Sequence, residues 1–102
     1  MSLEDAFAEE CRRAVEECRT LSPPYAPTAW IEMMEAHGAV DAAKRLLESS
    51  DIQSGFERLV RLGRTDLTVE MAVLHPRWDS LFRELHREAA HWRLTRAARG
   101  HT

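Results

Sequence analysis

Apolar side chains recur every three or four residues along most of the chain, the spacing that gives a helix one buried face. The pattern predicts six helices, over about residues 3–19, 28–37, 39–49, 56–62, 67–75 and from 77 into the nineties. β-Branched residues are sparse and nowhere alternate with polar ones over the length of a strand. We therefore expect an all-α fold, a compact orthogonal bundle of five to six helices.

Local signals set the expected ends of these helices. Ser2 followed by Asp5 is typical of a capping box, and Gly38 and Gly63 stand where helices end in a left-handed conformation. The fourth helix is expected to be capped by Ser54. Three prolines within SPPYAP (22–27) exclude a helix and favour a stiff connector.

These signals predict one domain over residues 1–102 that consists of four segments. We expect an N-terminal helix (1–21), a proline-rich strap (22–27), a helical core (28–96) and a tail (97–102) that frays.

The last helix carries the most regular apolar stripe. Its members are Trp78, Leu81, Phe82, Leu85, Ala89 and Trp92. Either all three tryptophans of the chain are core, or some form a contact patch, since aromatic residues are enriched at interfaces. The spacing does not choose between these two interpretations.

Composition places the chain among soluble globular domains, with 44% hydrophobic and 30% charged residues in 102. No apolar run approaches the ~20 residues of a membrane span, and the acidic start lacks the features of a signal peptide, so we expect a cytoplasmic protein. Cys11 and Cys18 lie seven residues apart on one helix, about 10 Å, so reduced core thiols are expected.

Charge is distributed unevenly along the chain. Residues 1–50 hold ten acidic and five basic side chains, whereas residues 77–102 hold six arginines and three acids. This asymmetry favours self-association or docking on a charged protein partner. The candidate interface residues are Trp78, Trp92, Arg83 and Arg87 of the last helix, with Glu9 and Glu16 of the first.

Glu70 stands alone as a carboxylate within a short apolar helix. If buried it requires a cation, and Arg64, Arg58 and Arg61 are near in sequence. No nucleophile or histidine lies at helical spacing from it. We expect a structural ion pair of Glu70 with Arg64, and no catalytic residue.

Metal, cofactor and direct DNA readout are not favoured by the motifs. Glu88 and His91 have the spacing of a di-metal bundle motif, but no second such pair exists, and no phosphate-binding loop is present. Residues 56–74 have helix-turn-helix spacing, yet the second helix has two acids and no base-reading side chain. In the last helix, Glu84 and Glu88 can pair with Arg87 and with other neighbours three or four residues away.

A resemblance to a known family extends over residues 25–94. It is carried by Tyr25, Pro27, Met34, Gly38–Val40, Ala42–Leu47, Gly55–Phe56, Leu59, Gly63–Arg64, Asp66–Glu70, Leu74 and Leu81–Phe82. With these residues, and above all the run GR-x-DLTVE, the chain resembles a small uncharacterised all-helical bacterial module. That module is found alone or at the C-terminus of larger proteins, including restriction and other defence nucleases. The resemblance implies an accessory or adaptor domain.

Together these features predict a non-enzymatic protein–protein interaction or adaptor module that works without a cofactor and is homodimeric or bound to another protein. Two alternatives stay open. One is an accessory or regulatory component of a bacterial restriction, defence or nucleic-acid-associated system. The other is a small enzyme that uses Glu70 with Arg64.

Overall fold

The computed structural model describes residues 1–49 and 54–100, and within these ranges every regular element is a helix. The α-helices are α1 (Leu3–Arg19), α2 (Thr28–His37), α3 (Ala39–Glu48), α4 (Ser54–Arg61), α5 (Val69–Val73) and α6 (Glu84–Gly100). Two 3₁₀ helices, η1 (Thr65–Leu67) and η2 (Pro76–Leu81), flank α5. The expected all-α fold is confirmed.

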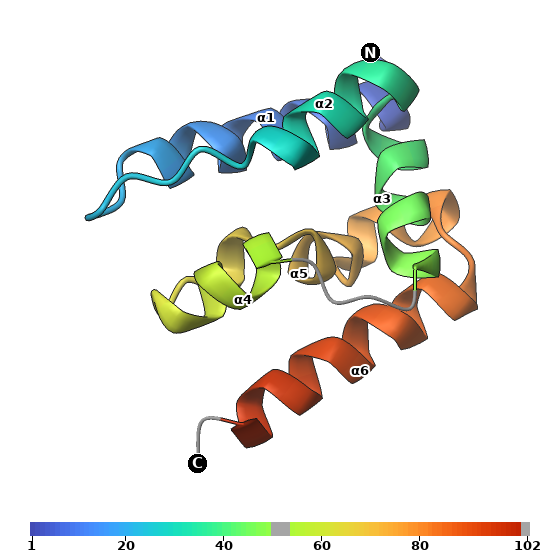
Figure 1. Cartoon of the computed structure of the whole chain (residues 1–102). Coiled ribbons are helices and arrows are strands. Elements are labelled where there is room, and N and C mark those ends of the chain that lie inside the picture. Colours follow the sequence, from blue (N-terminus) through green and yellow to red (C-terminus); the bar gives the residue numbers. More distant parts are fainter. Residues whose placement is uncertain (50–53, 101–102) are drawn as a thin grey trace.

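Helix α3 is the central element of the bundle. It contacts α1, α2, α5 and α6, and it joins the end of the molecule formed by α1 and α2 to the opposite side, along which α6 runs (Figure 1). Its buried side chains are small or branched, namely Ala39, Ala42, Ala43, Leu46 and Leu47. Because alanines let neighbouring backbones approach closely, four helices can pack around one.

The helix boundaries follow the expected local chemistry. Ser2 and Asp5 form a complete capping box at α1. Gly38 and Gly63 have φ angles of 81° and 73°, backbone conformations that residues with a Cβ atom rarely adopt. Thr68 begins α5 by accepting a hydrogen bond from the Met71 amide.

The proline-rich strap packs against the bundle through Tyr25. The Tyr25 amide donates to the Cys18 carbonyl over 3.0 Å, and the Arg58 guanidinium lies 5.1 Å from the tyrosine ring centre. A Cβ at Gly55 would come within 2.4 Å of the Tyr25 hydroxyl, so a larger residue in α4 would require the tyrosine side chain to shift.

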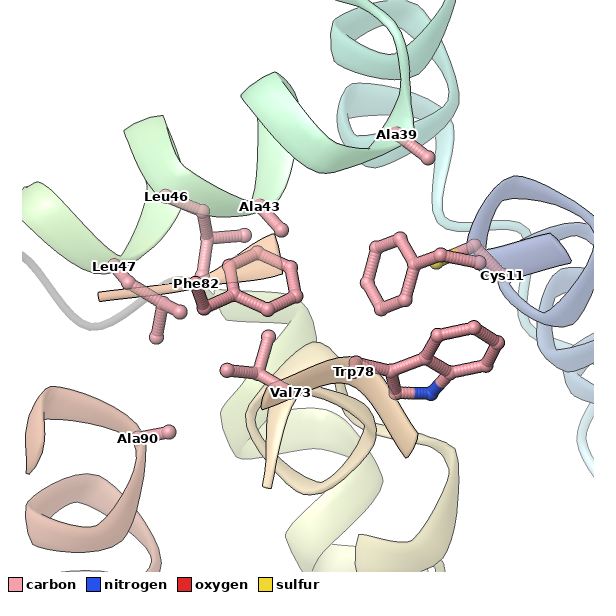
Figure 2. Packing of buried hydrophobic residues seen from close by; sticks show 10 residues of the cluster. Cys11, Ala39, Ala43, Leu46, Leu47, Val73, Trp78, Phe82 and Ala90 are labelled. Atoms are coloured by element: carbon pink, nitrogen blue, oxygen red, sulfur yellow. The ribbon is translucent and has the colours of Figure 1, made fainter. Parts of the chain in front are cut away.

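The core is centred on three aromatic rings. Phe7 packs edge-on against Trp78 and Phe82, with ring centres 5.4 and 5.2 Å away. Figure 2 shows Trp78 and Phe82 among apolar side chains from surrounding elements, which include Cys11, Ala43, Leu46, Val73 and Ala90. Trp78 is only 3% exposed, so its expected role at an interface is wrong; it is a core residue.

The last helix is shorter at its start than its periodicity predicted. Residues 76–81 form η2, the backbone is extended at Phe82, and α6 begins at Glu84. Arg87 stabilises this break, because its Nη1 donates to the Asp79 and Phe82 carbonyls over 3.0 and 2.7 Å. The Asp79 carbonyl also accepts from the Phe82 amide over 3.4 Å, so Arg87 adds a second donor there and binds the Phe82 carbonyl beyond the end of η2.

Two expectations concern residues that are only partly described. Residues 97–100 of the tail belong to α6, while residues 101 and 102 lie outside the described ranges. The turn at 50–53 and the capping role of the Ser54 side chain also lie outside what the structure describes.

Replacing Phe7 with alanine should remove the centre of the core. We expect Phe7→Ala to lower the free energy of unfolding by about 3–5 kcal/mol, because a cavity replaces the ring and both edge-on contacts are lost. Urea denaturation followed by circular dichroism measures the effect. Glu9→Ala, two residues away on the exposed side of α1, is the control and should change stability by less than about 0.5 kcal/mol. Equal small effects of both variants would contradict this placement of the core.

Candidate functional site

Glu70 lies in the first turn of α5 and faces α6. Its side chain is 2% exposed, and its Oε2 accepts a hydrogen bond from Nη1 of Arg93 over 3.1 Å. Nη2 of Arg93 donates to the carbonyls of Leu46 and Ser49 over 3.1 and 2.6 Å. One buried guanidinium therefore joins α5, α6 and the C-terminal end of α3.

The expected pair of Glu70 with Arg64 is wrong in its partner. Arg64 instead donates to both carboxylate oxygens of Asp66, over 3.1 and 3.0 Å, and to Glu17 of α1 over 2.8 Å. The left-handed turn at Gly63 directs Arg64 toward α1, and the new helix start at Thr68 directs Glu70 toward α6. Although they are close in sequence, Arg64 therefore joins η1 to α1, whereas Glu70 joins α5 to α6.

The position of Arg93 in the sequence could have indicated its burial. His86, Ala90 and Arg93 follow one another at spacings of four and three residues, and all three are buried. They form the inner face of α6. Apolar periodicity overlooks such a stripe because two of its three members are polar.

Burial and pairing oppose each other at Glu70. Burial is the largest influence and raises the pKa of this carboxyl group, while its hydrogen bond and the charge of Arg93 lower it. The more exposed Asp66 differs, since Arg64 lowers the pKa of that carboxyl group. Glu70 has an arginine already bound to it, which is the arrangement of a structural pair.

His86 makes the second buried polar contact of α6. Its Nδ1 accepts the Arg83 amide over 3.2 Å, and its Nε2 lies 2.8 Å from Oε2 of Glu48 in α3. Because Nδ1 is an acceptor, the ring proton of neutral His86 belongs on Nε2 and is donated to Glu48. This hydrogen bond holds the first turn of α6 against the C-terminal end of α3.

A mainly apolar cleft of about 110 Å³ lies beside Glu70. Its walls come from α1, the strap, α2, α4 and α5, and include Val15, Cys18, Tyr25, Trp30, Phe56, Leu59 and Val69. Burial raises the pKa of the Cys18 thiol, so the thiol stays protonated at neutral pH. Arg64 is not part of this lining, so the cleft does not bring Glu70 and Arg64 together as the enzyme alternative requires.

The outer face of α6 carries two exposed members of the predicted apolar stripe. Leu85 is 41% exposed and Trp92 is 55% exposed, so of the two interpretations left open for the tryptophans, Trp92 has the exposure that a contact patch requires. The Arg96 guanidinium covers part of the Trp92 ring, 5.3 Å from its centre. The surface formed by Leu85, Glu88, Ala89, Trp92 and Arg96 is named the α6 outer face below.

The remaining expected interface residues are dispersed. Arg83 is exposed, but Arg87 is held by backbone carbonyls and does not form the ion pair with Glu84 that their three-residue spacing allows. Glu9 and Glu16 are exposed on α1, and Glu16 pairs with Arg19 over 2.9 Å.

Residues 1–49 and 54–100 contain neither a metal-binding cluster nor a membrane-spanning helix. No group of three or more histidine, cysteine, aspartate or glutamate side chains is placed to hold a metal ion. In the same part of the chain, no helix has both the length and the apolar character needed to cross a membrane.

No family model, curated protein or solved structure matches this chain. Its resemblance to the bacterial module with the GR-x-DLTVE run remains an expectation from the sequence. Any functional assignment is therefore argued from the geometry of the described residues.

Removing the Glu70 carboxylate should leave the Arg93 guanidinium buried without its counter-ion. We expect Glu70→Ala to lower the free energy of unfolding by about 3–5 kcal/mol. Arg64→Ala, which breaks a largely exposed pair, should lower it by less than about 1 kcal/mol. Urea denaturation of both variants measures the contrast, and a larger loss in Arg64→Ala would contradict the assignment of partners.

The pH dependence of stability should carry a specific contribution from Glu70. Because its pKa is raised above the ordinary value of 4.5, the folded chain holds this proton more tightly than the unfolded chain. The stability contributed by protonated Glu70 is thus fully present below pH 4.5 and declines as pH rises toward the raised pKa. We expect the difference in unfolding free energy between wild type and Glu70→Gln to fall with rising pH in this window. A difference that grows with pH would show that the charge of Arg93 outweighs burial.

Proposed function

We propose that this chain is a protein–protein interaction module that binds a second copy of itself through the α6 outer face. The observation that carries the proposal is the exposure of Leu85 and Trp92 on a helix whose inner face is polar. Surface tryptophan and arginine side chains are the residues most enriched at the energetic centres of interfaces.

Three exposed side chains lie along one stripe, Leu85, Trp92 and Arg96, with the partly buried Ala89 at its edge. The four residues follow at spacings of four, three and four, which places them on the same side of a helix. A partner helix laid along this stripe would contact all four. Single exposed apolar residues need no explanation, but an aligned set favours a binding surface.

The inner face of α6, about 100° around the helix from this stripe, holds the stripe in place. Arg93 and His86 lie at the two ends of the inner face and attach the helix to Glu70 and the α3 carbonyls and to Glu48. A surface that is already ordered before binding loses less conformational entropy in the complex. This supports a role in recognition by a rigid helix.

The hydrogen bonds and ion pairs that the arginines of α6 already make favour a protein partner over nucleic acid. Arg93 is buried in its pair and Arg87 is bound to carbonyls, so neither is available to phosphates. Glu84 and Glu88 add negative charge along the same helix. These two carboxylates offset part of the charge of the exposed Arg83, Arg96 and Arg99, and affinity for nucleic acid depends on a clear excess of phosphate-neutralising cations.

Introducing a charge at the centre of the stripe should prevent self-association. We expect wild type to dimerise at tens of micromolar in light scattering, and Trp92→Glu to be monomeric, because a carboxylate would be buried against the second copy. Met71→Glu, at an exposed methionine of α5, is the matched control and should still dimerise. Thermal melting checks that both variants fold.

Three outcomes would overturn the proposal. They are a strictly monomeric wild type, a Trp92→Glu variant that still dimerises, and a salt-sensitive retention of the monomer on DNA that Trp92→Glu does not alter. The last result would favour the nucleic-acid-associated alternative.

A further inference from the structure

We propose that the apolar cleft between α1, the strap, α2, α4 and α5 binds a small neutral molecule that carries one aromatic ring. The described residues of its lining include none from α6, so this site is separate from the α6 outer face and does not depend on self-association. Three properties of the cleft carry the proposal, namely its size, the side chains that line it and the way its one charged group is paired.

The size of the cleft suits one ring. Its volume is about 110 Å³, whereas protein interiors are packed so closely that few spaces exceed a water molecule. An apolar cavity of about 150 Å³ stays dry and accommodates benzene. This cleft is somewhat smaller but is open to solvent near the exposed Ala29, so a single ring fits with a substituent at the opening. A peptide segment does not fit into a space of this size.

Aromatic side chains from three elements line this space. Tyr25 comes from the strap, Trp30 from α2 and Phe56 from α4. Aromatic rings attract one another in edge-on and offset arrangements by more than their apolar area alone provides. Cys18 and Met33 add sulfur atoms, which also make favourable contacts with ring edges. This lining favours an aromatic ring over an aliphatic group of equal size.

The charges around the cleft favour a neutral ligand. Glu70 is the only charged side chain among the described residues of the lining, and Arg93 already binds it over 3.1 Å. Arg58 lies 5.1 Å from the Tyr25 ring centre but is not part of the lining. An anion would therefore enter an apolar space without a cation to bind it, and a cation would have to compete with Arg93 for Glu70. For a neutral ring neither penalty arises.

The walls of the cleft are held together by contacts outside it. The Tyr25 amide donates to the Cys18 carbonyl over 3.0 Å, which attaches the strap to α1. Arg64 joins η1 to α1, since it donates to Glu17 over 2.8 Å. Sites for small molecules are usually formed before the ligand arrives and are mainly apolar with a few polar groups. The cleft has both characteristics, so binding requires little rearrangement of the chain.

The three tryptophans report on the site separately. Trp30 lines the cleft, whereas Trp78 lies in the core and Trp92 on the α6 outer face. We expect titration with phenol at neutral pH, followed by two-dimensional ¹H–¹⁵N NMR, to shift the Trp30 indole resonance saturably and to leave the Trp92 resonance unchanged. The dissociation constant should be about 0.1–1 mM, as expected for a ligand of so few atoms.

Two further compounds test the class of ligand. Benzoate has the same ring but is an anion at neutral pH, and we expect it to bind at least tenfold more weakly than phenol. Cyclohexanol has the size of phenol without the aromatic ring, so it should also bind more weakly.

Filling the cleft tests its location. Ala14 of α1 lines the cleft, so Ala14→Leu should occupy the space and weaken phenol binding at least tenfold. Ala29→Leu, at the exposed opening, is a second blocking variant that leaves the buried walls unchanged. Ala36→Leu, at an exposed position of α2 outside the lining, is the matched control and should bind phenol like wild type. Thermal melting checks that each variant folds.

Four results would overturn the proposal. They are no saturable shift of the Trp30 resonance at millimolar phenol, a shift of the Trp92 resonance in its place, benzoate binding as tight as that of phenol, and folded Ala14→Leu and Ala29→Leu variants that bind phenol like Ala36→Leu. None of these results bears on self-association, which the Trp92→Glu variant tests by itself.

Discussion

The buried guanidinium of Arg93 is the contact on which the arrangement of the helices depends. It binds Glu70 of α5 and two carbonyls at the end of α3, and it is 3% exposed. An unpaired buried charge is strongly unfavourable, so these three elements must meet at one point for the chain to fold. The central position of α3 follows, because both ends of the inner face of α6 are attached to it or to its neighbours.

This contact explains why α6 presents its apolar stripe to solvent. Rotating the helix by about 100°, one residue, would bury Leu85 and Trp92 but carry Arg93 and His86 toward the surface. Glu70 would then be buried without a cation, and the α3 carbonyls would lose their donor. The polar contacts therefore prevail over apolar periodicity in choosing the inner face.

The parts of the fold that depend on neighbouring residues were predictable from the sequence, and the site was not. The capping box at Ser2, the left-handed glycines 38 and 63, and the all-helical content each arise from interactions within a few residues. The partner of Glu70 lies 23 residues away, and only tertiary packing makes Arg93 closer than Arg64. Trp78 and Trp92 belonged to one predicted stripe, yet the break at Phe82 separates them into core and surface.

The composition of α6 is consistent with a helix that is covered on both sides. Its inner face contributes polar contacts that fix orientation, while its outer face contributes apolar area that an isolated chain leaves in water. Burying that area in a dimer would stabilise the assembly by roughly 25 cal/mol per Å² before the costs of association are subtracted. The polar residues of α6 thus place the helix within the chain and thereby decide which of its apolar side chains are left in water.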